Sequence, residues 1–132
     1  MDMKLELVAV PVSDVDRAKA FYVEQVGFHP DHDHEVSDEI RFVQLTPPGS
    51  ACSIALGKGI TDAPPGAAQG IQIVVADIEA AHAELGERGV EILQGPHRVA
   101  VLGDFEIWMA FFEDTEGNTL AVTSEKPVAP AS

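Results

Sequence analysis

The pattern of hydrophobic and polar positions divides the chain into two similar blocks joined by a linker. In the first block, an extended apolar run precedes apolar residues at helical spacing, and two further extended runs follow. A glycine follows the helical pattern directly, which is a common way for a helix to end. The expected elements of this block are strands over 5–12, 38–46 and 51–56 and a helix over 15–26 that ends at Gly27.

The second block begins after residues 57–70, which hold four glycines and two prolines and are predicted to be a linker. Asp77 is a suitable N-cap for a second helix, and Gly89 is its expected stop. The expected elements of this block are strands over 71–75, 90–93, 105–113 and 119–123, a helix over 78–88, and a flexible tail over 126–132.

The two blocks also align with each other in sequence. At an offset of 63 residues, the segment Val12-Ser13-Asp14-Val15-Asp16 lies on Val75-Ala76-Asp77-Ile78-Glu79. At an offset of 68 residues, Gly49 lies on Gly117, and each glycine follows one strand and precedes another. Since both order and spacing repeat, we predict two copies of a strand–helix–strand–strand–strand (βαβββ) module, over about 1–58 and 68–125.

Composition and charge limit the kinds of partner. The 132 residues fit one domain, and 8 basic against 22 acidic residues give a net charge of −14. This charge repels phosphate backbones and anionic lipids, so we expect no nucleic acid or membrane partner. Cys52 is the single cysteine, and residues 1–6 are unlike a signal peptide. We therefore expect a cytoplasmic protein.

The repeated motifs resemble the vicinal oxygen chelate superfamily, which includes glyoxalase I, extradiol dioxygenases, fosfomycin resistance enzymes and bleomycin-binding resistance proteins. The resemblance covers residues 3 to about 124 and rests on VSDVDRAKAFY and on FFEDTEGNTLAV. The family motif Phe-x-Asp-Pro-Asp-Gly-Asn is present as 112–118, with Thr115 and Glu116 replacing the proline and one aspartate. The resemblance implies an α+β fold in which two βαβββ modules form an eight-stranded incomplete barrel. Such a fold does not by itself select an activity.

Metal-dependent members of this family bind a divalent ion through four side chains, His or Glu, in the first and last strand of each half. Counting from the capping aspartates and the turn glycines, the resemblance places these positions at Leu7, Ser53, Gly70 and Ala121. Leucine, glycine and alanine offer no ligand atom, and a neutral serine hydroxyl alone is a poor one. We therefore expect no metal and no other cofactor, which argues against the metal-dependent reactions of the family.

Strand alternation predicts which side chains would line the cup, the sheet face on which the family binds its ligands. Positions on this face are small or mildly polar, whereas the opposite face is apolar and would pack on the helices. Trp108 is the expected stacking surface, although an aromatic cluster of this kind can also be plain core. The residues predicted to contact a ligand are Trp108, Ser53, Gln72, Thr119, Arg41 and Gln44.

A few side chains are candidates for chemistry. His97, in a segment that resembles the family's variable loop over the cup, and Glu106 are weak candidates for acid–base groups. The segment 29–35 brings three imidazoles together and could hold a transition metal, although a solvated polar edge explains the same pattern. These imidazoles belong to His29, His32 and His34.

Three functions remain open at this stage. The first is a metal-free protein of the bleomycin-resistance type that binds a small organic molecule, neutral or cationic because the chain is strongly negative. The second is a glyoxalase-like lyase, an isomerase or a dioxygenase-type enzyme with a non-standard or metal-free site. The third is a structural or regulatory partner without a ligand. A homodimer is expected in each case, because the edges of the sheets need covering.

Overall fold

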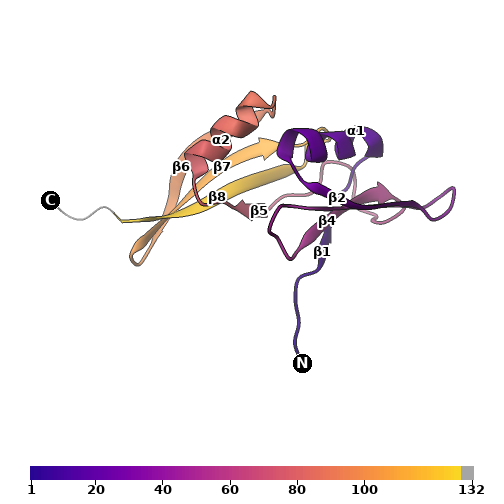
Figure 1. Cartoon of the computed structure of the whole chain (residues 1–132), viewed down its shortest axis with the longest axis horizontal. Helices are drawn as coiled ribbons and strands as arrows, with labels where there is room; N and C mark the ends of the chain where they lie inside the picture. The colour runs from indigo at the N-terminus through magenta and orange to yellow at the C-terminus, as the bar shows by residue number, and fades with distance from the viewer. Residues whose placement is uncertain (129–132) are drawn as a thin grey trace. The chain divides into compact units, whose positions relative to one another are not determined.

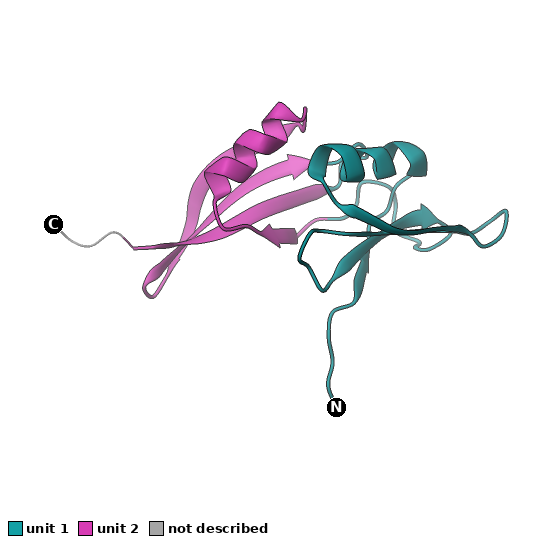
Figure 2. Ribbon diagram, in the orientation of Figure 1, with its two compact units in different colours: residues 1–68, 114–118 teal, residues 69–113, 119–132 magenta. Residues whose placement is uncertain are grey.

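The computed structural model describes residues 1–128, which form two compact units (Figure 2). Unit 1 comprises Met1–Ala68 and Asp114–Asn118, and unit 2 comprises Gln69–Glu113 and residues 119–128. The chain therefore returns to unit 1 for the five residues that join the last two strands of unit 2. Within residues 1–128, no helix combines the length and the apolar character that crossing a membrane requires.

Unit 1 contains one helical segment and a four-stranded sheet of order β1-β4-β3-β2 (Figure 1). Strand β1 is parallel to β4, and the other pairs are antiparallel. Asp14 caps the helix as expected, because its carboxylate accepts from the Arg17 N–H at 3.1 Å, and Gly27 ends it at φ 94°. The elements are β1 (Leu7–Ala9), α1 (Val15–Ala20), its π-helical continuation η1 (Phe21–Val26), β2 (His29–Glu35), β3 (Arg41–Thr46) and β4 (Ser53–Lys58).

Unit 2 repeats this topology with the sheet order β5-β8-β7-β6. Asp77 caps its helix by accepting from the Ala80 N–H at 3.1 Å, and strand β5 is parallel to β8. The elements are β5 (Ile71–Val74), α2 (Ile78–Glu87), β6 (Ile92–Leu102), β7 (Phe105–Glu113) and β8 (Thr119–Pro127). The predicted pair of βαβββ modules is confirmed, with the same strand order in both.

Several predicted strand boundaries are wrong. In unit 1, β1 and β3 are shorter than the expected 5–12 and 38–46, and in unit 2 two strands are longer than expected. Strand β6 continues to Leu102, well past the expected 90–93, because its pairing with β7 shifts register at three points, one of which accommodates the Gly95-Pro96 segment within the strand. Strand β8 continues to Pro127, so the predicted tail over 126–132 begins too early; Lys126 forms an ion pair with Glu79 of α2. The end of that predicted tail, 129–132, lies outside the described residues.

Each sheet has two chemically different faces. The helix of each unit lies against one face, where the large fully buried apolar side chains of both units are found (Figure 1). These include Val43, Leu45 and Leu56 in unit 1 and Ile78, Phe112 and Leu120 in unit 2. We call the other side of each sheet, which its own helix does not cover, the open face. The burial of apolar area on the helix side stabilises each unit.

A buried carboxylate organises the turn between β7 and β8. Oδ2 of Asp114 accepts from the Tyr22 hydroxyl at 2.7 Å and from Asn118 Nδ2 at 2.8 Å. Its Oδ1 accepts from the backbone N–H groups of Glu116 and Asn118 at 2.8 and 2.9 Å. Tyr22 is fully buried, and burial, followed by the nearby Asp114 carboxylate, raises the pKa of its hydroxyl above the usual value. The hydroxyl therefore stays protonated and remains a donor.

We predict that Tyr22→Phe lowers the free energy of unfolding by about 2 kcal/mol, because a buried carboxylate loses a hydrogen bond worth about 1.5–3 kcal/mol. Urea unfolding at neutral pH measures this loss. Ser13→Ala is the matched control, since Ser13 also donates a hydroxyl to a carboxylate, that of Glu116 at 2.7 Å, but on the surface. Its expected cost is about 0.5 kcal/mol or less. Equal losses in the two variants would contradict this prediction.

Candidate functional site

The open face of unit 1 carries a continuous chain of polar side chains. Leu7 of β1 pairs with Ser53 of β4, whose hydroxyl lies 2.7 Å from Thr46 Oγ1 on β3. Gln44 Nε2 donates to Ser53 Oγ at 3.2 Å, and the Thr46 hydroxyl is hydrogen-bonded to the carboxylate of Asp31 on β2. Ser53 is buried, with 5% of its surface exposed. Four polar side chains from three strands are thus connected on one face.

The open face of unit 2 is more apolar. The first of its cross-strand rows consists of Gln72, Ala121 and Phe111. The next row consists of Thr123, Met109 and His97. The His97 ring lies 5.9 Å from the Phe111 ring at an interplanar angle of 34°, and both side chains are half-buried. An aromatic ring, a thioether and an imidazole therefore form one surface.

The strand register corrects one of the four expected metal-ligand positions. Leu7 pairs with Ser53 as expected, but Ala121 pairs with Gln72 rather than with Gly70. The residues at these positions do not fit a divalent ion, because they offer one hydroxyl and one amide. Within residues 1–128, no three His, Cys, Asp or Glu side chains are grouped so that they could share a metal ion.

The expected position in unit 2 is wrong because the connection between the first strand and the helix differs in length between the two units. Val10 and Val75 are equivalent, because their N–H groups donate to Ala55 and Thr123 at matching places in the two sheets. The capping aspartate follows four residues after Val10 in unit 1 but two residues after Val75 in unit 2. Counting back from the cap therefore misplaces the strand of unit 2 by two residues.

Trp108 lies on the helix side of β7, so the prediction that it forms the stacking surface of the cup is wrong. It pairs with Ser124, and its Nε1 donates to Glu106 at 3.0 Å. Lys126 Nζ lies 4.2 Å above the indole ring and also pairs with Glu79 of α2. Since neighbouring residues of a strand point to opposite faces, the open face receives Met109 and Phe111 instead.

Glu106, a predicted acid–base candidate, lies on this helix side with Trp108. Hydrogen bonds from Trp108 and then Arg98 lower the pKa of its carboxyl, which therefore stays ionised. An ionised surface carboxylate in an ion pair with Arg98 at 3.2 Å is a structural group rather than a proton donor.

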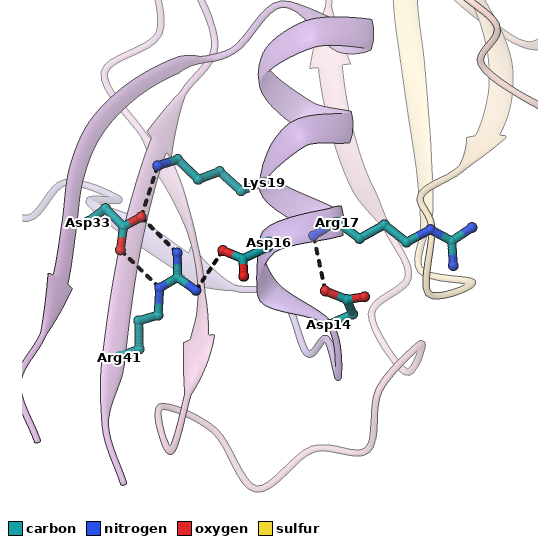
Figure 3. Close-up of polar contacts among 6 residues, drawn as sticks. All are labelled: Asp14, Asp16, Arg17, Lys19, Asp33 and Arg41. Carbon is teal, nitrogen blue, oxygen red and sulfur yellow. Dashed lines mark hydrogen bonds and ion pairs between the residues drawn. The ribbon is translucent and has the colours of Figure 1, made fainter. Parts of the chain in front are cut away.

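Arg41 is the second predicted ligand contact found on the helix side. Figure 3 shows its guanidinium between Asp33 of β2 and Asp16 of α1, with Lys19 also bonded to Asp33. Arg41 donates to Asp33 at 3.0 and 2.9 Å and to Asp16 at 2.9 Å. These bonds, led by the one from Arg41, hold the pKa of Asp33 well below its usual value, and they raise the pKa of Arg41. Arg41 thus fastens α1 to the sheet and does not reach the open face.

The other predicted contacts are on the open faces. Ser53 and Gln44 are brought together in unit 1, and Gln72 lies opposite Ala121 in unit 2. Thr119 pairs with Glu113 at the start of β8, two residues before Ala121 and on the same face. Four further residues of these faces are not among the predicted contacts: Asp31, Thr46, Met109 and Phe111. The alternation of β7, counted from its pairing with Ala121, would have found the last two.

One of the candidate histidines is placed differently from the prediction, and the other three form the solvated polar edge that the sequence also allowed. His97 lies in strand β6 rather than in a loop, and its Nδ1 is 2.9 Å from the Gly95 carbonyl. His32 and His34 lie on the exposed edge strand β2 with their rings stacked 5.9 Å apart, and His29 contacts Asp31 at 3.8 Å. The segment 29–35 is therefore an exposed polar edge of the sheet in unit 1.

A hollow of about 600 Å³ lies on the helix side of unit 1, at the start of α1. Its charged lining consists of Asp14, Asp16, Glu35, Asp38, Arg41 and Lys58. Arg41 is engaged by carboxylates, and Lys58 donates to the Asp38 carbonyl at 2.7 Å. The hollow is open and polar, and it shares no residue with the polar chain of the open face.

Comparison with known proteins gives the class of this chain. The model of the glyoxalase/bleomycin resistance protein/dioxygenase superfamily matches residues 4–122, and the chain belongs to that superfamily. Among curated proteins it is similar to the uncharacterized protein YetH of Bacillus subtilis (strain 168), with 27% identity over 89% of this chain and 95% of YetH.

Two solved structures share the fold over nearly the whole chain. TnmS3, an antibiotic binding protein from Streptomyces sp. CB03234, is 33% identical, covers 95% of this chain and 98% of its own, and has a TM-score of 0.78. A member of the superfamily from Sphaerobacter thermophilus DSM 20745 is 28% identical over 93% of this chain and 98% of its own, with a TM-score of 0.81. The expected glyoxalase/bleomycin-resistance fold is confirmed.

We predict that Asp33→Asn flattens the dependence of stability on acidic pH. The pKa of Asp33 is lowered by folding, so its contribution is present above the unfolded value of about 3.9 and is lost as pH falls through the lower folded value. At neutral pH, the variant should lose about 1 kcal/mol. Urea unfolding between acidic and neutral pH measures both effects. Glu35→Gln is the control, because Glu35 lies on the same strand but outside this network. If stability depends on pH in the same way in wild type and in Asp33→Asn, the lowered pKa of Asp33 is not the source of that dependence.

Proposed function

We propose that this chain binds a small organic molecule, neutral or cationic, on its open sheet faces, without a metal ion and without chemical conversion. Membership of the superfamily supports the proposal, as does the likeness to the antibiotic binding protein TnmS3. The observation that carries it is the surface formed by Phe111, Met109 and His97, which the helix of unit 2 leaves uncovered.

Phe111 is the residue best suited to hold a flat ligand. Its ring is half-buried and tilted against His97, so little side-chain freedom is lost when a second ring stacks on it. Met109, two residues away on the same face, supplies a polarizable thioether beside it. Gln72 and Thr123 lie in the adjoining positions and offer a few hydrogen bonds for orientation.

The side chains at the family's metal-ligand positions support a metal-free site. The positions equivalent to the family's metal ligands carry Leu7, Ser53, Gln72 and Ala121. A hydroxyl and an amide, both neutral, are weak ligands for a transition metal compared with imidazole or carboxylate. Binding in this chain would then depend on apolar contact and hydrogen bonds.

We predict that the purified protein contains far less than one transition metal ion per chain and that a chelator leaves its melting temperature unchanged. Elemental analysis and thermal unfolding measure the two quantities. Metal-free bleomycin, which carries a flat bithiazole, and doxorubicin, which carries a flat fused ring system, are both cationic and are the probes for binding. At least one should raise the melting temperature, and the rise should increase with its concentration. One tightly held metal per chain, or no effect of either probe, would refute the proposal.

We predict that Phe111→Ala weakens the binding of whichever probe is retained by at least about tenfold, because the ligand loses a stacking contact of about 0.5–1.5 kcal/mol together with apolar burial. Isothermal titration calorimetry measures the change. Trp108→Phe is the control on the same strand but the opposite face, and it should change the affinity less than about twofold. A larger loss of affinity in Trp108→Phe than in Phe111→Ala would place the ligand on the helix side of β7 and contradict the prediction.

His97 favours one alternative function. Its imidazole lies on the open face beside Phe111, where it could transfer a proton in a metal-free lyase or isomerase. The hemithioacetal of methylglyoxal and glutathione is the substrate that tests a glyoxalase-like reaction. Turnover that His97→Gln abolishes would favour the enzyme, and binding without turnover favours the main proposal. If neither is found, a structural or regulatory role remains.

A homodimer is also part of the proposal. Strands β2 and β6 are edge strands within their sheets, and paired edges are a common basis of symmetric association. Sedimentation of the purified protein at micromolar concentration tests this point, since a single species at 14.1 kDa would refute it.

A further inference from the structure

The polar chain on the open face of unit 1 has a fixed direction of hydrogen bonding. An ionised carboxylate can only accept, so the Thr46 hydroxyl must donate to Asp31. That bond uses the single hydrogen of Thr46, and Ser53 must therefore donate in the 2.7 Å contact between the two hydroxyls. Ser53 in turn accepts from Gln44 Nε2 at 3.2 Å. The order of donors is Gln44, Ser53, Thr46 and then Asp31.

This order determines which end of the Gln44 amide is engaged. The amide nitrogen is turned toward Ser53, and the carbonyl oxygen Oε1 has no hydrogen-bond donor among residues 1–128. Gln44 is half-buried, so its position is constrained by packing as well as by the bond to Ser53. A ligand on this face therefore meets a carbonyl oxygen that Asp31 orients through two hydroxyl groups.

The charge of Asp31 is poorly compensated. In the part of the chain that the structure describes, its ion-pair contact is with His29 at 3.8 Å, and the His29 side chain is 74% exposed. Asp33, two residues further along β2, provides the contrast, because it lies on the helix side and is paired with both Arg41 and Lys19. One of the two aspartates is thus neutralised by cations, and the other leaves a negative charge on the open face.

We infer that the open face of unit 1 binds the protonated amine of a ligand, which donates to Gln44 Oε1 with Asp31 as its counter-charge. This inference rests on the proposed function and names the chemistry of the ligand. An ammonium group satisfies both features, since it supplies a donor for the carbonyl and a positive charge for the carboxylate. A carboxylate ligand would satisfy neither.

The polar chain differs from one whose only role is to stabilise the sheet. A polar chain that served only to stabilise the sheet would end in compensated groups, as the Asp33–Arg41 network does. Here a carbonyl at one end and a carboxylate at the other are left with capacity to accept. The buried Ser53 hydroxyl and the half-buried Thr46 hydroxyl between them keep that arrangement in one orientation.

Two probes that differ only in the charge of one group test the inference. Tryptamine and indole-3-propionate share the indole ring and a two-carbon linker, and they end in an ammonium and a carboxylate respectively. Titration of the ¹⁵N-labelled full chain measures both affinities and reports the Gln44 side-chain amide signal. We expect tryptamine to bind at least about tenfold more tightly and to shift that signal.

Matched variants assign the preference to its residues. Asp31→Asn should reduce the preference for tryptamine to about threefold or less, because the charge is removed. Glu35→Gln removes the same charge from the same strand and should leave the preference unchanged. Ser53→Ala should weaken tryptamine several-fold, because Gln44 is then free to reorient.

Three outcomes would overturn the inference: equal affinities for the two probes, no shift of the Gln44 signal at millimolar tryptamine, or an unchanged preference in Asp31→Asn. If bleomycin or doxorubicin still binds in that case, the proposed function survives and the amine site fails. If those probes fail while tryptamine binding depends on Asp31, the amine site stands, and the part of the proposed function that places a flat ligand on Phe111 of unit 2 fails.

Discussion

The carboxylate of Asp114 is the group on which unit 1 is built, because a buried charge must be satisfied and four donors satisfy it here. The same turn fixes the segment before α1, since Asn118 donates to the Pro11 carbonyl at 2.9 Å and accepts from the Ala68 N–H. Glu116 then accepts from Ser13 and from the Asp14 N–H, which places the N-cap of α1. With α1 in place, Asp16 and Lys19 can meet Arg41 and Asp33 on the sheet. The ion pairs that join α1 to the sheet of unit 1 therefore lie on the helix side, and they use no side chain of the open face.

The two residues that depart from the family motif, Thr115 and Glu116, differ in their effect on the turn. Glu116 keeps a carboxylate at the position of the replaced aspartate, and burial raises its pKa less than the bonds from Asp14 and Ser13 lower it, so the side chain stays ionised for its capping role. Thr115 is less well adapted, because its Oγ1 is buried without a hydrogen-bond partner among the described residues. A proline at this position would carry no such atom, so the threonine costs stability without an evident return.

Local signals predicted both helices and every strand except β2, whereas the faces of the strands depended on pairings that local signals do not contain. The helix ends could be predicted from single residues. The carboxylates of Asp14 and Asp77 cap the two helices, and Gly27 ends the first one in the left-handed conformation that glycine adopts easily. The face of Trp108 could not be, because it depends on which residue of β8 lies opposite. The resemblance places His97 in a variable loop, whereas the structure has it in β6, because the bulges that accommodate Gly95 and Pro96 within the strand leave no local signature. Asp31 reaches the open face through a similar irregularity between Pro30 and His32.

The two modules have diverged on their open faces and not in their topology. Gln44 and Met109 occupy equivalent places, since their partners Ala55 and Thr123 accept from Val10 and Val75 in the same way. Their neighbours on the next strand are His32 and His97. The helix sides of both modules must keep the apolar positions that bury their helices, and in unit 1 also the ion pairs of Arg41, so changes there are costly. The open faces carry no such requirement from their own helices. One module could therefore acquire a polar chain that ends in a carboxylate, and the other an aromatic and thioether surface, while both kept the same strand order. Duplication has in this way given one chain two chemically distinct surfaces on the same framework.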